Sequence, residues 1–173
     1  MIRTPRTDFY RFSHGRLSLK LLPTSVADIS NPAFIGCRQY HANFAVETQL
    51  IFKPQRVGQF AGMVCFQNEY YRIDFGKMMV DGVASLVVLR TENGVSELIT
   101  RKTLSRAQNR KQLQLHIDGD GDQYTFSASF GSEDTPFFTV PVDGGHLSTE
   151  KAGGFTGTVI GLYASSNHPV GNE

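Results

Sequence analysis

The chain has 173 residues, of which 40% are hydrophobic and 19% charged, values typical of a globular protein and not of a disordered one. Its 17 basic and 16 acidic residues leave a formal net charge of +1, which excludes a large field of either sign for capturing nucleic acid or an anionic membrane. No apolar run approaches the roughly 20 residues of a membrane-spanning helix, and the basic first residues lead into no apolar signal-peptide core. The compartment of the protein stays open.

Most of the predicted elements are strands, because apolar and polar residues alternate with a period of two over short stretches. In chain order, the predicted strands are residues 17–21, 44–52, 62–67, 70–75, 84–90, 96–100, 113–117, 123–129, 137–140 and 156–164. Residues 28–31 and 103–109 are each predicted to form a short helical turn. Pairs such as Asp81-Gly82 and Asn93-Gly94 separate the strands and suit tight hairpin turns.

This organisation predicts one all-β domain over residues 1–173. Short strands that are separated by turns at intervals of roughly 8–12 residues are typical of a β-sandwich or a barrel. No repeat and no low-complexity linker divides the chain.

The metal-binding residue types do not form a recognisable site. Cys37 and Cys65 each lie in an apolar, strand-like stretch, so we expect two buried free thiols and no structural zinc. The run Asp118-Gly119-Asp120-Gly121-Asp122 resembles the start of a calcium loop. Gln123 stands where that loop needs a glycine, and Ser129 stands where it needs a bidentate glutamate. We therefore expect a hairpin here, with no bound metal and no cofactor.

The sequence also contains no complete catalytic motif. Its five histidines are scattered and lack the motifs of a serine hydrolase or a metalloprotease, and His116 is expected to face solvent from its strand. Glycoside hydrolysis needs two carboxyl groups a few ångströms apart. Glu47 and Asp74 lie inside predicted strands, and each is expected to be a sheet-surface residue or the partner of an arginine. We therefore assign no catalytic residue.

Three longer stretches are more specific. Residues 32–41 read Pro-Ala-Phe-Ile-Gly-Cys-Arg-Gln-Tyr-His, and Phe52-Lys53-Pro54 follows them. Residues 61–69 read Ala-Gly-Met-Val-Cys-Phe-Gln-Asn-Glu, and residues 153–164 read Gly-Gly-Phe-Thr-Gly-Thr-Val-Ile-Gly-Leu-Tyr-Ala. In this order, from about Arg3 to Ala164, the chain resembles the C-terminal concanavalin A-like domain of the β-xylosidases of glycoside hydrolase family 43.

The resemblance implies a fold and a partner. The fold is a concanavalin A-like (jelly-roll) β-sandwich of two antiparallel sheets, and the partner is a five-bladed propeller in the same parent chain. In such enzymes the propeller carries the catalytic carboxylates and removes xylose or arabinose units from oligosaccharides. None of those carboxylates maps onto this sequence. The resemblance therefore implies a non-catalytic accessory domain that meets the xylo- or arabino-oligosaccharide only indirectly.

The resemblance also implies which residues matter. Phe155, in the Gly-Phe-Thr-Gly turn, matches the aromatic residue that the sandwich sends to the rim of the sugar pocket in the partner domain. Arg38, Gln39 and His41 match the Arg-Gln run, which would line the interface with the propeller. Two structural alternatives stay open: Phe155 caps the sandwich core, and the Arg-Gln pair satisfies buried polar groups.

The chain departs from the family at both ends, and these departures indicate a module excised from a longer enzyme. The family usually has a tryptophan a few residues before Arg3, and it usually continues beyond Glu173 with an Ala-Asp-Phe-Asp-aromatic strand. Without that strand an open sheet edge is compatible with a homo-oligomer. The alternative function is an independent, lectin-like carbohydrate-binding module. It would use Tyr70, Tyr71 or Tyr163 as the stacking surface, since the chain has no tryptophan.

Overall fold

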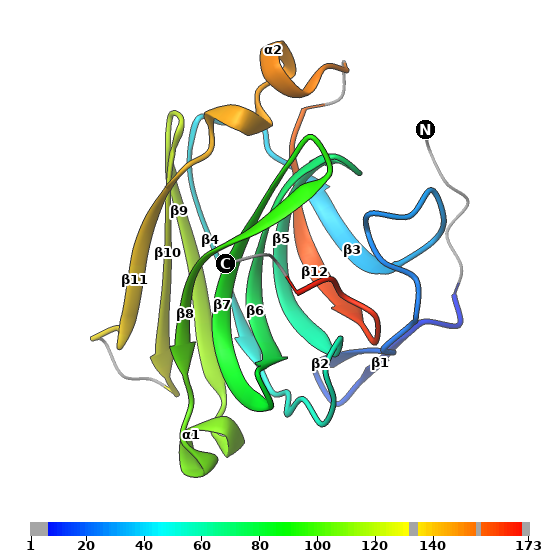
Figure 1. Cartoon of the computed structure of the whole chain (residues 1–173), viewed down its shortest axis with the longest axis vertical. Helices are drawn as coiled ribbons and strands as arrows, with labels where there is room; N and C mark the ends of the chain where they lie inside the picture. The colour runs from blue at the N-terminus through cyan, green and yellow to red at the C-terminus, as the bar shows by residue number, and fades with distance from the viewer. Residues whose placement is uncertain (1–6, 132–134, 155–156, 171–173) are drawn as a thin grey trace.

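The computed structural model describes residues 7–131, 135–154 and 157–170, and two antiparallel sheets packed face to face make up most of them (Figure 1). The six-stranded sheet has the order β3 (Ala33–Arg38), β12 (Val159–Ser165), β5 (Phe60–Asn68), β6 (Tyr71–Val80), β7 (Val83–Glu92) and β8 (Val95–Thr103). The four-stranded sheet has the order β11 (Phe138–Asp143), β10 (Gln123–Phe130), β9 (Leu113–Asp120) and β4 (Asn43–Leu50). A separate hairpin pairs β1 (Tyr10–Ser13) with β2 (Arg16–Leu19). The predicted all-β sandwich is confirmed.

Helical segments are short. The predicted turn at 103–109 corresponds to α1 (Arg106–Arg110), which begins at a capping box formed by Ser105 and Gln108. Two further segments, η1 (Gly145–Leu147) and α2 (Thr149–Ala152), were not predicted. The prediction of a helical turn at 28–31 is wrong, because the Asp28 carboxylate accepts the backbone N–H of Ser25 at 2.7 Å and so closes a turn before it. None of the helices in the described ranges is long and apolar enough to cross a bilayer.

Two-residue turns set the register of the central hairpins. Asp81 and Gly82, between β6 and β7, have φ angles of 50° and 73°. Asn93 and Gly94, between β7 and β8, have φ angles of 52° and 79°. Both pairs adopt the left-handed backbone that a tight hairpin turn with the twist of a sheet requires, so the predicted turns are confirmed.

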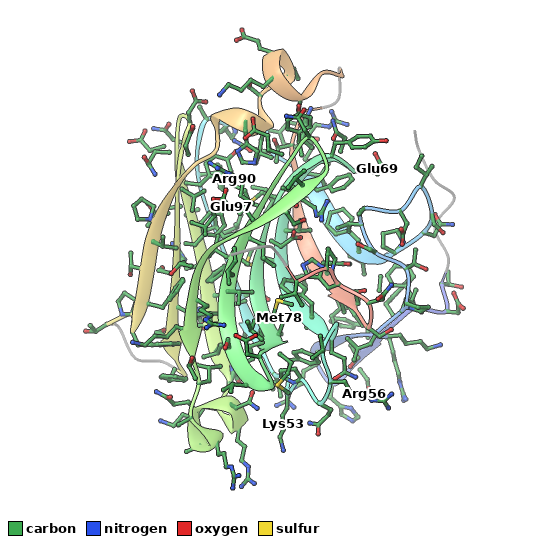
Figure 2. The ribbon with its side chains drawn as sticks, viewed as in Figure 1. Lys53, Arg56, Glu69, Met78, Arg90 and Glu97 are labelled. Carbon is green, nitrogen blue, oxygen red and sulfur yellow. The ribbon has the colours of Figure 1, made fainter. Side chains whose placement is uncertain are left out.

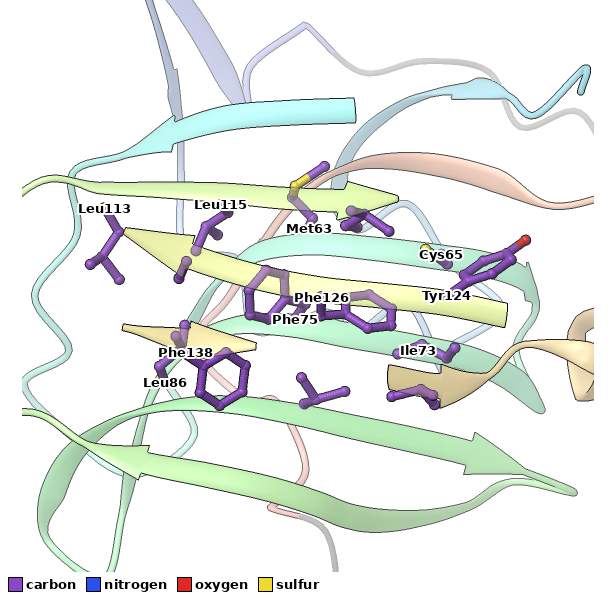
Figure 3. Close-up of a cluster of buried hydrophobic side chains, with 14 of the residues drawn as sticks. Met63, Cys65, Ile73, Phe75, Leu86, Leu113, Leu115, Tyr124, Phe126 and Phe138 are labelled. Carbon is purple, nitrogen blue, oxygen red and sulfur yellow. The ribbon is translucent and has the colours of Figure 1, made fainter. Parts of the chain in front are cut away.

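The main core lies between the sheets (Figure 3). Phe75 of β6 is its centre, with the Phe126 ring 5.4 Å away in an edge-on arrangement and the Phe138 ring 6.0 Å away in a stacked one. Leu113, Leu115 and Ile117 of β9 are fully buried against it, while Gln114 and His116 on the alternate positions face outward. The alternation predicted for this strand is therefore confirmed.

The opposite face of the six-stranded sheet is buried as well. Phe60, Val64, Met78 and Tyr163 form a second cluster there, beneath Val26 of the segment that precedes β3. The segment after β12 also covers this face, and Figure 1 shows it crossing the sheet. Backbone hydrogen bonds from Ser166 to the Leu22 carbonyl and from His168 to the Gly58 carbonyl, both 2.8 Å long, hold it in place. We call residues 166–170 the C-terminal strap.

Under the strap lies a buried charged pair. The guanidinium of Arg72 donates from Nε to Asp74 Oδ2 at 3.0 Å, and both side chains are almost fully buried. The expectation that Asp74 partners an arginine is confirmed. His168 of the strap stacks on the Phe60 ring at 4.3 Å, and its Nε2 lies 3.8 Å from the same Asp74 oxygen.

The edges of the six-stranded sheet differ. At one edge, Glu97 of β8 faces Arg90 of β7, and their carboxylate and guanidinium are 2.8 Å apart (Figure 2). Charged side chains on an edge strand discourage pairing with another chain. At the other edge, Cys37 of β3 is exposed whereas Cys65 is buried, so the expectation of two buried thiols is wrong for Cys37. The main core reaches Ile160 of β12 but includes no residue of β3, because the four-stranded sheet does not extend over this edge strand.

We predict that the strap makes the domain acid-sensitive. Burial lowers the pKa of His168 to about 4. The nearby Asp74 carboxylate partly opposes this shift because it favours the protonated imidazole, whereas the Arg72 guanidinium lowers the pKa further. In the unfolded chain this imidazole binds a proton near pH 6.5, so the folded state binds fewer protons between pH 6.5 and 4 and loses stability as the pH falls through that window. The loss should be on the order of 2–3 kcal/mol, measured from urea unfolding at pH 7 and pH 4.5.

The control is His168→Gln, which retains a polar side chain that does not titrate. Its free energy of unfolding is expected to be lower at pH 7 but to change less between the two pH values. An equal pH dependence in both proteins would contradict the assignment to His168.

Candidate functional site

The loops at one end of the sandwich, which we call the loop end, come from distant parts of the chain. They are residues 39–42 between β3 and β4, the β9–β10 turn, the η1–α2 segment, and the residues that flank β12 on its N-terminal side. Figure 1 shows α2 projecting from this end. The loops surround a hollow of about 300 Å³, whose walls include Gln39, Tyr124, Ser148 and Thr158.

Gln39 connects three of these segments. Its Oε1 accepts a hydrogen bond from the Tyr124 hydroxyl at 2.6 Å, and its Nε2 donates to the His41 carbonyl at 3.1 Å. Its backbone N–H donates to the Thr158 carbonyl at 2.9 Å. Burial raises the pKa of Tyr124 to about 12, so the phenol remains a donor at neutral pH. Gln39 therefore joins the start of the β3–β4 loop to β10 and to the residues before β12.

A second group of hydrogen bonds holds the segment between α2 and β12. Gln67 donates from Nε2 to the Gly153 carbonyl at 3.3 Å, and its Oε1 accepts from the Thr158 hydroxyl at 3.4 Å. Asn68 donates from Nδ2 to the Ala152 carbonyl at 3.0 Å. Because Gln67 and Asn68 end β5, a strand inside the six-stranded sheet, they tie the carbonyls of Ala152 and Gly153 and the hydroxyl of Thr158 to that sheet.

Phe155 itself lies outside the described residues, so its role stays a prediction. The glycines before it are described: Gly153 and Gly154 have φ angles of 72° and 84°, in the left-handed region that other residues rarely occupy. Glycine is therefore favoured at these two positions because a residue with a side chain would be strained at such positive φ angles. The predicted sharp turn before Phe155 is consistent with these angles.

The neighbours of Gln39 behave differently from it. Arg38, Tyr40 and His41 are exposed, and Tyr40 shows 82% of its surface. In the described parts of the chain, the side chains of Arg38 and His41 make no hydrogen bond or ion pair. Tyr40 was missed as a candidate, although it stands between two candidate residues in the sequence. Such an exposed aromatic ring, next to the residue whose hydrogen bonds hold the 39–42 loop, is suited to contact with another protein surface.

The candidates for catalysis are far from one another. Glu47 is exposed on the outer side of the four-stranded sheet, whereas Asp74 is buried on the outer side of the six-stranded sheet. The main core separates them, so they cannot act as a pair on one glycosidic bond. The run at 118–122 forms the end of the β9–β10 hairpin, as predicted. Among the described residues, no three metal-binding side chains gather at one place.

The tyrosines proposed for a lectin-like surface also separate. Tyr163 is only 1% exposed and packs under the strap, so its candidacy was wrong. Tyr71 is half-buried and donates its hydroxyl to Asn93 Oδ1. Tyr70 is exposed at the tip of the β5–β6 hairpin. These three side chains do not form one stacking platform.

Comparison with known proteins gives a consistent result. A family model described as the beta xylosidase C-terminal concanavalin A-like domain matches residues 1–173. The chain is 28% identical over 162 residues to a xylosidase/arabinosidase of Butyrivibrio fibrisolvens, with 92% of this chain and 30% of the relative covered. It is 26% identical over 168 residues to a non-reducing end alpha-L-arabinofuranosidase of Bacteroides ovatus, with 96% and 31% covered.

Solved structures share the fold. The Bacteroides ovatus xyloglucan PUL GH43B superposes with a TM-score of 0.83 at 26% identity, over 96% of this chain and 32% of that one. The xylan beta-1,4-xylosidase from Bacillus halodurans superposes with a TM-score of 0.79 at 20% identity, over 88% and 30%. The chain therefore spans about a third of the length of these proteins.

The anchoring by Gln67 can be tested directly. We predict that Gln67→Leu lowers the free energy of unfolding by about 1–3 kcal/mol, because it leaves the Gly153 carbonyl and the Thr158 hydroxyl without their partner. Hydrogen exchange at the amides of Gly153, Gly154 and Gly157 should become faster. Gln55→Leu is the matched control, since Gln55 is exposed and, among the described residues, its side chain bonds only to the nearby Lys53 carbonyl. Equal exchange at these glycines in both variants would rule out the anchoring role.

Proposed function

Since the chain belongs to the family of β-xylosidase C-terminal concanavalin A-like domains, we propose that it is the non-catalytic sandwich of a family 43 glycoside hydrolase. In this proposal the loop end packs on the catalytic propeller of the same protein and completes the rim of its sugar pocket. The chain spans only about a third of its relatives, which supports a role within a longer enzyme.

The observation that carries the proposal is the construction of the loop end. Gln39, Gln67 and Asn68 hold its loops by side-chain hydrogen bonds, while Tyr40 and His41 beside them stay exposed. A domain that must present a loop to a partner benefits from such anchoring, because a loop that is already ordered loses little entropy when it docks. Arg38 and His41 would then contact the propeller, together with Tyr40.

Phe155 is the residue that would reach the sugar pocket. The segment that carries it begins at the Gly153 carbonyl and ends at Thr158, and Gln67 bonds to both. An aromatic ring at the pocket rim would exclude water and hold the terminal sugar in register with the catalytic carboxyl groups. The sugar would be xylose or arabinose, in line with the names of the relatives, a xylosidase/arabinosidase and an arabinofuranosidase.

The chain by itself is predicted not to hydrolyse glycosides. Purified without a partner domain, it should release no nitrophenol from nitrophenyl xyloside or nitrophenyl arabinofuranoside above the uncatalysed rate, since Glu47 and Asp74 lie on opposite sides of the core. Turnover that copurifies with the chain and disappears on substitution of one Asp or Glu would contradict this.

For Phe155, we predict that Phe155→Ala changes the free energy of unfolding of the chain by less than about 0.5 kcal/mol, as for a surface position. In the intact enzyme the same change should lower kcat/KM by roughly tenfold to a hundredfold, because the sugar is no longer held in register. Phe12→Ala is the control: Phe12 is 72% exposed in β1, and its loss should leave both quantities unchanged.

If Phe155 instead caps the core, the expected effects on stability and on kcat/KM are reversed. Phe155→Ala would then destabilise the chain by about 3–5 kcal/mol, and the intact enzyme would keep its kcat/KM at a temperature where it stays folded. That pair of results would refute the role at the pocket rim.

A further inference from the structure

The outer face of the four-stranded sheet carries a hollow of about 700 Å³ that lies over β4, β9 and β10. The pairing of the strands explains its polar lining. Glu47 faces His116, which faces Ser127, and Gln49 faces Gln114, which faces Ser129. Two neighbouring rows of three polar side chains therefore cross the sheet. Adjacent strands lie about 4.8 Å apart, so each row is roughly 10 Å long, close to the length of two sugar rings.

The floor of the hollow is formed by the short side chains of β10. Ser127 and Ser129 stand beside the longer side chains of β9, so the surface is lowered over β10. Ser129 lies at the bottom of the hollow, so its hydroxyl can exchange a water molecule for a hydroxyl group of a ligand.

The longer side chains are already oriented. Gln114 donates from Nε2 to Glu47 Oε2 at 3.0 Å, and His116 Nε2 lies 2.9 Å from Asp118 Oδ2. Side chains that are held before binding lose less rotational freedom when a ligand arrives. The rows combine acceptors, such as the Glu47 carboxylate, with amide donors. Neighbouring hydroxyl groups of a sugar act as donor and acceptor at once, so they match this combination.

The lining also argues against other ligand classes. Among the described residues it contains no lysine or arginine, so a phosphate or another polyanion finds no counter-charge there. Its apolar members, Ala128 and Pro136, are too few for a lipid or an apolar peptide. We propose that this hollow is a binding site for a neutral oligosaccharide, held mainly by hydrogen bonds. The site lies on a sheet face and is separate from the loop end, so it does not depend on the proposed function.

The test is a titration of the ¹⁵N-labelled chain with three neutral probes, xylotetraose, arabinotetraose and cellotetraose, and with tetragalacturonate as the anionic comparison. Concentrations up to about 20 mM cover dissociation constants in the millimolar range. We expect saturable shifts for at least one neutral probe, confined to amides of β4, β9 and β10 around the hollow. Tetragalacturonate should cause smaller shifts.

Two variants and a control locate the binding. Gln114→Ala and Ser129→Val should each weaken the binding of that probe by roughly tenfold, because a hydrogen-bond partner is lost in the complex. Thr139→Ala should bind normally, since Thr139 faces Ser127 from β11 on the same sheet face but does not line the hollow. Gln114 is half-exposed, so Gln114→Ala decides the test if Ser129→Val fails to fold.

Three results would overturn the proposal. The first is the absence of saturable shifts with all three neutral probes. The second is a set of shifts centred on the loop end, at residues 39–42 and 157–158, which would place sugar binding with the proposed function instead. The third is normal binding by Gln114→Ala.

Discussion

The burial of the six-stranded sheet on both faces is the constraint on which the rest of the structure depends. Almost every residue of β6 is buried, and its neighbours β5 and β7 are similar. The four-stranded sheet covers one face, and the segment before β3 together with the C-terminal strap covers the other. Polar groups on this doubly covered strand need internal partners, because water cannot reach them. Arg72 donates to Asp74 Oδ2, although Asp74 Oδ1 has no hydrogen-bond partner among the described residues, and Lys77 donates to the carbonyls of Phe52 and Asn109.

This rigid centre also supports the loop end. A loop becomes precise when it is tied to elements that do not move, and β5 ends in two side chains that perform this task. Gln67 and Asn68 reach residues that are more than 80 positions later in the chain, at Gly153 and Ala152. Gly153 and Thr158, which flank the Phe155 segment in sequence, are therefore tied to a strand that is buried on both faces.

The four-stranded sheet has a different burial pattern, because only one of its faces is covered. Its strands alternate between apolar residues that point into the core and polar residues that point to solvent, as in many antiparallel sheets. The polar positions stand opposite one another across β4, β9 and β10, which produces the two rows of the outer hollow. The two sheets thus have different roles. The buried six-stranded sheet holds the loops by hydrogen bonds, and the half-exposed four-stranded sheet presents a polar surface.

The sequence by itself determined the features that depend on neighbouring residues. Alternation predicted β9 and β10, the pairs Asp81-Gly82 and Asn93-Gly94 predicted two hairpins, and the spaced motifs identified the family. Strand β3 lacks alternation, so only the stretch around Cys37 was judged strand-like and no bounds were predicted for it. The prediction for β6 stopped at Phe75 because a strand buried on both faces shows no period of two. Only the tertiary structure decided that Cys37 is exposed, that Gln67 anchors Gly153, and that Ser129 lies in a hollow. These properties depend on which distant segment covers a residue, and local patterns carry no information about that.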